Sequence, residues 1–188
     1  MALIKLQRNG LTPGASGLDY LGRTTISSGV TTVDITFDTT NYASFKFILN
    51  GVRAVNDAVD YRLRYSVDGG SSFQAGGTDY GYIGFTERVS GALQMVEDND
   101  NGIFRLTSSE GKGGTGTKEI PSFEINLWND QDYPKITVVG STYNHAGNFA
   151  HLYRNCVFNT TSTVNALRFD LESGNFASGT IDTYGFSK

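Results

Sequence analysis

Cysteine, histidine and charge are all scarce in this chain of 188 residues, and each shortage excludes a class of protein. A single cysteine, Cys156, excludes an intrachain disulfide framework. Charged residues make up 18% of the sequence and aromatic residues 12%, whereas a disordered chain is rich in charge and poor in aromatics. The formal net charge of −4 disfavours general nucleic-acid binding. No apolar run approaches the roughly 20 residues that a membrane helix needs, so we expect no membrane insertion.

The first residues do not match a secretory leader, because the apolar part of Met1–Leu6 is too short and no cleavage pattern follows it. We therefore expect synthesis in a cytoplasm. Without disulfides, stability must come from core packing and from oligomerisation. Cys156 has Val157 and Phe158 as neighbours, which predicts a small core residue and not a reactive thiol.

Residues for metal or nucleophilic chemistry are not grouped in the sequence. His145 and His151 lie six residues apart with no carboxylate at a matching interval, and neither is near a nucleophile-elbow pattern. The acidic run 97–102 imitates the start of an EF-hand loop, but its closing acid would fall at Ser108 and it would need flanking helices. A looser calcium site between strands stays open. The sequence predicts no catalytic residue, resident metal or cofactor.

Short runs of alternating apolar and polar residues fill the chain from residue 21 onward, separated by Gly, Ser, Thr, Asn and Asp. This alternation is the period of a strand with one buried face. We expect about ten strands, with no linker between them and no sustained helical periodicity. The predicted fold is an all-β, antiparallel, jelly-roll-like β-sandwich, formed by residues 21–188 as one domain.

Residues 1–20 differ from this pattern and predict an extended N-terminal arm. They carry little apolar surface and several turn signals, so they cannot form a core of their own. An arm with a few apolar anchors docks onto its own domain, a neighbouring subunit or a larger assembly. The residues expected to anchor it are Leu3, Ile4, Lys5, Leu6 and Arg8.

Residues 61–73 form the best-defined stretch of the chain. Three apolar residues alternate with polar ones up to Ser66, and Asp68-Gly69-Gly70 supplies turn chemistry before Phe73 resumes the apolar face. We predict a β-hairpin that fixes the register of its neighbours. The segment also resembles the Asp box, a structural and non-catalytic hairpin motif that repeats in sialidase propellers. The resemblance implies a structural role for Ser66, Asp68, Gly70, Ser72 and Phe73.

Residues 87–119 are polar and glycine-rich, with only 103–106 typical of a strand. We interpret them as long loops, which is where recognition concentrates on a β-scaffold. Aromatic side chains near such loops are able to stack on sugar rings, although core packing also explains many aromatics. The candidate ligand residues are Asp98, Asp100, Trp128, Tyr133 and Tyr143, with Tyr80, Tyr82 and Tyr153 as further stacking candidates.

Segments through most of the chain share a turn-rich β pattern with one group of proteins: Met1–Leu6, Thr24–Val30, Val33–Phe37, Tyr42–Phe47, Arg64–Phe73 and Leu171–Gly185. They resemble small tail-fibre and other virion proteins of tailed bacteriophages, marine and cyanobacterial ones especially. The resemblance implies a non-enzymatic virion protein, made in the host bacterial cytoplasm and attached to the particle by its arm.

This resemblance leaves several roles open. A tail-fibre or receptor-binding component is the first expectation, and a capsid decoration protein is the alternative. Other virion proteins would be its partners, it would assemble as a homotrimer, and it would contact a host-surface glycan or receptor. A polysaccharide depolymerase and a free carbohydrate-binding module are further alternatives from other classes.

Overall fold

The computed structural model describes residues 17–188 except 90, 92, 109–111, 130–131 and 145. These residues form twelve strands and no helix: β1 (Leu18–Ile26), β2 (Thr32–Thr36), β3 (Tyr42–Ala54), β4 (Tyr61–Ser66), β5 (Tyr80–Arg88), β6 (Leu93–Asn101), β7 (Phe104–Arg105), β8 (Ser122–Trp128), β9 (Lys135–Tyr143), β10 (Phe149–Phe158), β11 (Ala166–Leu171) and β12 (Phe176–Ser187).

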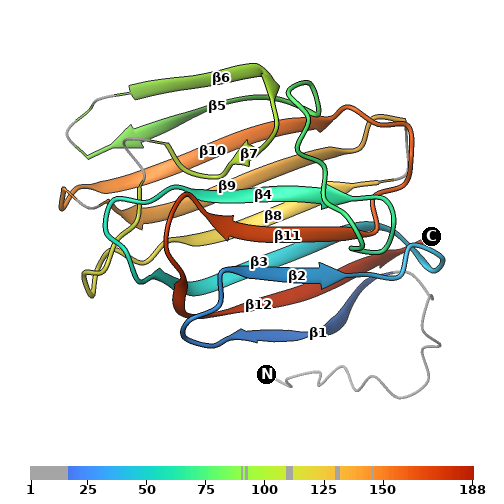
Figure 1. Cartoon of the computed structure of the whole chain (residues 1–188), viewed down its shortest axis with the longest axis horizontal. Helices are drawn as coiled ribbons and strands as arrows, with labels where there is room; N and C mark the ends of the chain where they lie inside the picture. The colour runs from blue at the N-terminus through green and yellow to red at the C-terminus, as the bar shows by residue number, and fades with distance from the viewer. Residues whose placement is uncertain (1–16, 90, 92, 109–111, 130–131, 145) are drawn as a thin grey trace, which may run out of the picture.

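The strands form two antiparallel sheets that pack face to face (Figure 1). The large sheet has the strand order β1-β12-β3-β8-β9-β10-β5-β6, and the small sheet has the order β2-β11-β4-β7. Sequence neighbours often lie in different sheets, as in a jelly roll. The predicted all-β sandwich is confirmed.

The core lies between the two sheets because alternate side chains of each strand point inward. Along β9, for example, Ile136 and Val138 are buried while Lys135 and Val139 are exposed. The small sheet covers them with its own inward row of Leu63, Leu167 and Phe169. Cys156 is buried, as predicted, and burial raises the pKa of its thiol well above the usual value.

One arginine lies inside this core. Arg154 on β10 is fully buried, and its guanidinium donates hydrogen bonds to the backbone oxygens of Phe85 and Tyr153 and to the hydroxyls of Thr86 and Ser108. Burial lowers its pKa to about 10. Gly84 stands directly opposite Arg154 in the β10–β5 ladder and leaves the space that the side chain occupies.

The interpretation of residues 87–119 as long loops is wrong for much of their length. Residues 93–101 form β6, an edge strand of the large sheet that pairs with β5, and β7 pairs with β4 at the edge of the small sheet. Charged residues are common on edge strands because they discourage pairing with a second chain. The acidic run that suggested a loop is therefore part of an edge strand.

The predicted hairpin at residues 61–73 is also corrected. β4 forms as expected, but its ladder partners are β11 and β7, and the next strand, β5, belongs to the other sheet. After the turn, the backbone returns to β4 through the hydrogen bond that the Gln74 N–H donates to the Tyr65 carbonyl, and no ladder follows it. Residues 67–79 are thus a crossing loop between the sheets.

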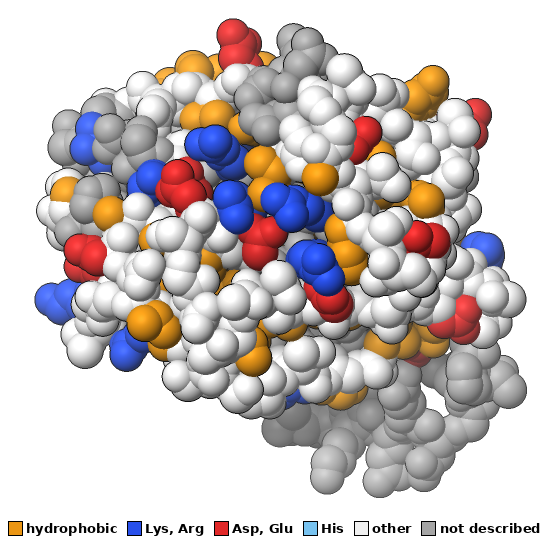
Figure 2. Space-filling view, in the orientation of Figure 1, with side chains coloured by type: hydrophobic (Ala, Val, Ile, Leu, Met, Phe, Trp, Pro, Cys, Tyr) orange, Lys and Arg blue, Asp and Glu red, His pale blue; other side chains and the backbone are white. Residues whose placement is uncertain are grey.

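The sheet begins earlier than the expected boundary at residue 20. β1 starts at Leu18, which pairs with Phe186, so the first and last described strands lie side by side (Figure 1). The arm residues Leu3, Ile4, Lys5, Leu6 and Arg8 lie outside the described residues. Figure 2, in the same orientation, shows basic and acidic side chains gathered at the centre of the face that the small sheet forms.

Candidate functional site

The Asp-box residues form a closed hydrogen-bond network in the crossing loop. The Ser66 hydroxyl accepts hydrogen bonds from the backbone N–H groups of Asp68 and Gly70, at 3.2 and 2.9 Å, and donates one to Asp68. The Asp68 carboxylate also accepts from the N–H and the hydroxyl of Ser72, at 2.9 and 2.6 Å. The hydrogen bonds from Ser72 and Ser66 lower the pKa of Asp68 to about 2. These side chains stabilise the loop.

The same loop is tied to β11. Gly69 donates its N–H to the Asn165 side chain at 2.8 Å, and Asn165 donates back to the Val67 carbonyl at 3.1 Å. Phe73, at the end of the motif, lies under the guanidinium of Arg168, 4.1 Å from its ring centroid. A cation held over an aromatic face at this distance is attracted by the ring quadrupole. The motif therefore places an aromatic ring against an arginine of the small sheet.

The aromatic ligand candidates are exposed but dispersed. Trp128 and Tyr143 both point outward from the large sheet, and Tyr133 lies in the loop between β8 and β9. Trp128 pairs with Lys135 at one end of β9, so Tyr143 at the other end is roughly 27 Å away. Tyr80 and Tyr82 are buried in the core and are not available for stacking. Tyr153 is half-buried on the outer face of the large sheet.

Tyr133 has an uncommon backbone conformation for an aromatic residue, with φ of 60°. Its N–H donates to the Thr160 carbonyl at 3.0 Å, which ties the loop to the segment after β10. A bulky residue in the left-handed region is held there by its surroundings at an energetic cost. The backbones of Asp98 and Asp100 lie in β6, and their side chains lie outside the described part of the structure.

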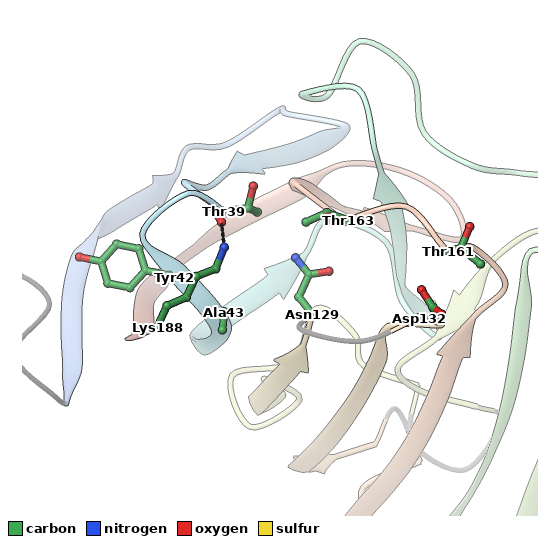
Figure 3. Close-up of a pocket in the computed structure, with 8 residues that line it drawn as sticks. All are labelled: Thr39, Tyr42, Ala43, Asn129, Asp132, Thr161, Thr163 and Lys188. Atoms are coloured by element: carbon green, nitrogen blue, oxygen red, sulfur yellow. Dashed lines mark hydrogen bonds between the residues drawn. The ribbon is translucent and has the colours of Figure 1, made fainter.

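A polar pocket of about 420 Å³ opens beside this loop (Figure 3). Asn129 in its centre is committed to the fold, because its amide donates to the Val164 carbonyl and accepts from the Val164 N–H. Lys188 donates to the Thr39 carbonyl at 2.8 Å. Asp132 lies at the opposite end of the pocket from Lys188. The pocket is lined by Thr39, Tyr42, Ala43, Asn129, Asp132, Thr161, Thr163 and Lys188.

A second hollow of about 420 Å³ lies in the large sheet, on the side facing away from the core. Gly81 contributes no side chain to it, and nothing lies within 4 Å of the position a Cβ would take there. The two exposed apolar side chains at the hollow, Ile83 and Val157, flank this space, while Glu97 and Asn155 contribute a carboxylate and an amide. We call this hollow the sheet-face groove; it is lined by Gly81, Tyr82, Ile83, Glu97, Asn155, Cys156 and Val157.

The ladder register explains why these residues meet. Gly81 stands opposite Val157, and Ile83 stands between Asn155 on β10 and Glu97 on β6. The pairing of β5 with β6 is irregular between Tyr80 and Tyr82, beside the groove. Bulges of this kind often reshape a sheet next to a functional site.

An aromatic and apolar row borders the groove. Phe85 and Tyr153 are the next outward residues on β5 and β10, and their rings stack with centroids 5.6 Å apart. Val139 and Met95 extend the row on either side, and both are exposed. Trp128, two strands across from Val157, lies roughly 10 Å from it on the same face. Apolar floor, ring faces and a few hydrogen-bonding groups suit a small polyhydroxylated ligand.

Sequence reasoning misses the groove because its residues come from three strands. The local pattern places Gly81 and Ile83 in an aromatic strand and Glu97 in an acidic loop, and it points to no site at Asn155. A glycine at an outward position of a strand is the one available signal. Of the predicted ligand and stacking residues whose side chains are described, Trp128 and Tyr153 lie on the same face near the groove.

Comparison with known proteins identifies no family. No protein-family model matches the sequence, and no curated protein matches it. Among solved structures, the chain is similar to galectin LEC-6 of Caenorhabditis elegans, with a TM-score of 0.38 and 10% sequence identity over 86% of this chain and 94% of the galectin. A similarity of this strength carries no argument about function.

The described residues contain no group of three or more His, Cys, Asp and Glu side chains placed to hold a metal ion. Within the same part of the chain, no segment is a helix with the length and apolar character needed to cross a membrane.

Proposed function

We propose that this chain is a non-enzymatic virion protein of a tailed bacteriophage whose β-sandwich binds a host-surface glycan in the sheet-face groove. The sequence resemblance to tail-fibre proteins supports the virion role, and the groove supports the ligand. Its volume of about 420 Å³ lies within the range of small-ligand sites.

The observation that carries the proposal is the combination of groups on one rigid surface. The Glu97 carboxylate is able to accept hydrogen bonds from sugar hydroxyls, and the Asn155 amide is able both to donate and to accept them. Beside them, the stacked rings of Phe85 and Tyr153 provide an apolar surface. Sites built on strands hold their groups more precisely than sites built on loops. We therefore propose a tail-fibre, receptor-binding role, and we expect assembly with other virion proteins as a homotrimer.

Filling the groove tests the ligand. In Gly81→Leu the new side chain enters open space, so the sandwich should fold while binding to host-surface polysaccharide weakens at least tenfold. Gly77→Leu is the matched control, because Gly77 lies outside the groove and a Cβ added there would also have nothing within 4 Å. Binding is measured by immobilised-polysaccharide interferometry. Equal binding by both variants and the parent protein would contradict the proposal.

Two assays separate the proposal from its alternatives. Immunogold labelling of intact particles places the protein on the tail or on the head, and head labelling would favour a capsid decoration protein. Release of reducing ends from the polysaccharide would identify a depolymerase. Glycan binding without any particle association would identify a free carbohydrate-binding module.

A further inference from the structure

The outer face of the small sheet carries four arginines in adjacent register positions. Arg168 on β11 stands directly opposite Arg64 on β4, and Arg62 on β4 stands directly opposite Arg105 on β7. We call Arg62, Arg64, Arg105 and Arg168 the arginine cluster; Figure 2 shows basic and acidic side chains gathered over the small sheet. Like charges directly opposite each other destabilise a sheet, so this register works against folding.

Carboxylates lie beside all four arginines, but they accept hydrogen bonds from only Arg62 and Arg168 among the described residues. Arg168 holds Asp34 through two contacts of 2.7 Å, and Arg62 donates to Asp170 at 2.7 Å. Arg105 lies 3.5 Å from the buried carboxylate of Asp60. These pairs explain how the face tolerates most of its positive charge.

Arg64 is different. Among the described residues it donates no hydrogen bond: its Nε is buried without an acceptor, and its Nη1 lies 3.7 Å from the Oδ2 of Asp170, too far for a hydrogen bond. That carboxylate is already bonded to Arg62. The Arg64 side chain keeps 29% of its surface exposed, so a ligand in solution is able to reach it.

The surroundings distinguish a saccharide from a protein partner. None of the large apolar side chains that are exposed among the described residues lies on β2, β4, β7 or β11. Protein interfaces often depend on large aromatic and aliphatic anchors, and these four strands expose none among the described residues. Thr32 and Thr36 on β2, both exposed, provide hydroxyls on either side of Asp34. A charged, hydroxyl-bearing surface suits a polyhydroxylated anion.

We propose that Arg64, supported by Arg168 and Arg62, binds the carboxylate or sulfate group of an acidic saccharide. A guanidinium presents a planar fork of donors that matches an oxyanion in two-point contact. The Asp-box loop contributes by placing Phe73 against Arg168, which fixes one wall of the site. The cluster lies on the opposite outer face of the sandwich from the sheet-face groove, so the two sites are independent.

The test is a titration of the full, isotopically labelled chain followed by NMR at constant ionic strength. Galacturonate should shift the amide signals of β4 and β11, and galactose, its neutral counterpart, should not. Galactose 6-sulfate distinguishes a sulfate from a carboxylate preference. Arg64→Gln should weaken galacturonate binding at least tenfold. Lys118→Gln, which removes the same charge from an exposed loop position, should not.

Several results would overturn the proposal: equal shifts with galactose, unchanged binding by Arg64→Gln, or tighter binding of an oligoglutamate peptide than of galacturonate, which would indicate a protein partner. If Arg64→Gln fails to fold, Arg64→Lys takes its place in the test. This variant keeps the positive charge but loses the planar fork of donors, so its affinity for galacturonate should be lower than that of the parent protein. An affinity equal to that of the parent would overturn the proposal. Gly81→Leu should bind galacturonate as tightly as the parent protein does. This result distinguishes a failure of the arginine-cluster proposal from a failure of the proposed glycan site in the sheet-face groove.

Discussion

At the scale of single residues, the large sheet depends on a glycine that faces the core. A Cβ at Gly84 would lie 2.1 Å from the Tyr153 carbonyl oxygen and 2.7 Å from the Cδ of Arg154. The backbones of β5 and β10 would have to separate, and the Arg154 side chain would have to shift as well. Glycine is thus required at this position because the Tyr153 carbonyl and Arg154 across the ladder occupy the space that a Cβ would take.

We predict that Gly84→Ala lowers the free energy of unfolding by about 3 kcal/mol or more, at the upper end of the range for overpacked cores. Gly81→Ala, three residues earlier on the same strand, is the control, since its methyl group meets open space. Urea denaturation of the two variants gives the comparison. Equal stabilities would mean that the core around Arg154 adapts to the added carbon.

At the scale of elements, the Asp-box loop has a pH dependence whose direction follows from its hydrogen bonds. The pKa of Asp68 falls from an ordinary 3.8 to about 2 in the folded loop. A lowered pKa means that the network contributes its stabilisation above the unfolded pKa and loses it as the pH falls toward 2.

We therefore expect the loop to loosen in acid between about pH 4 and pH 2. The Gly70 and Ser72 amide signals should move together with an apparent pKa near 2, because both N–H groups donate into this network. Asp68→Asn should abolish that titration. A Ser72 amide signal that titrates near 4 would show that the carboxylate is not held as described.

The alternation of apolar and polar residues predicts which segments form strands, but it predicts poorly which strands pair with each other in a sheet. The period-two pattern of residues 61–66 predicts β4 correctly, because that pattern depends only on which side chains face the core. The hairpin prediction fails because pairing is decided by contacts distant in the sequence, here with β11. β6 escapes sequence reasoning because an edge strand carries charged residues that imitate a loop.

The candidate sites are less accessible to sequence reasoning. Alternation correctly places Arg62 and Arg64 on a wet face, but Arg168 lies more than a hundred residues away and meets them only through the β11–β4 register. The stacked pair of Phe85 and Tyr153 depends on the same kind of long-range pairing. Chemistry assembled across strands requires the strand order, which local patterns do not contain.

At the scale of the whole molecule, the N-terminal arm is predicted to anchor the sandwich to the particle. Residues 1–16 lie outside the described part of the chain, so this prediction rests on the sequence. Deleting them leaves β1 complete, and the truncated protein should keep its melting temperature while failing to enter particles. Deleting residues 1–26 should also lower the melting temperature, because it removes β1 and leaves Asp182 without Arg23.

Particle incorporation is measured by blotting purified virions, with the melting temperature as the check on folding. Normal incorporation of the shorter truncation would contradict the anchoring role. A lowered melting temperature for that truncation would instead assign residues 1–16 to the stability of the sandwich.

The pairing of Leu18 with Phe186 brings the two ends of the folded domain to one corner of the large sheet. A short glycine-rich bridge would span that gap, and new termini are accommodated best where few backbone hydrogen bonds cross. The turn at residues 77–78 is exposed and lies outside the strand ladders, although Asn159 donates to the Thr78 carbonyl and Asp79 donates its N–H to the Gly76 carbonyl. The domain is thus suited to circular permutation. A permutant opened at residues 77–78 would have its new termini at this turn, and a protein fused to them would be displayed there.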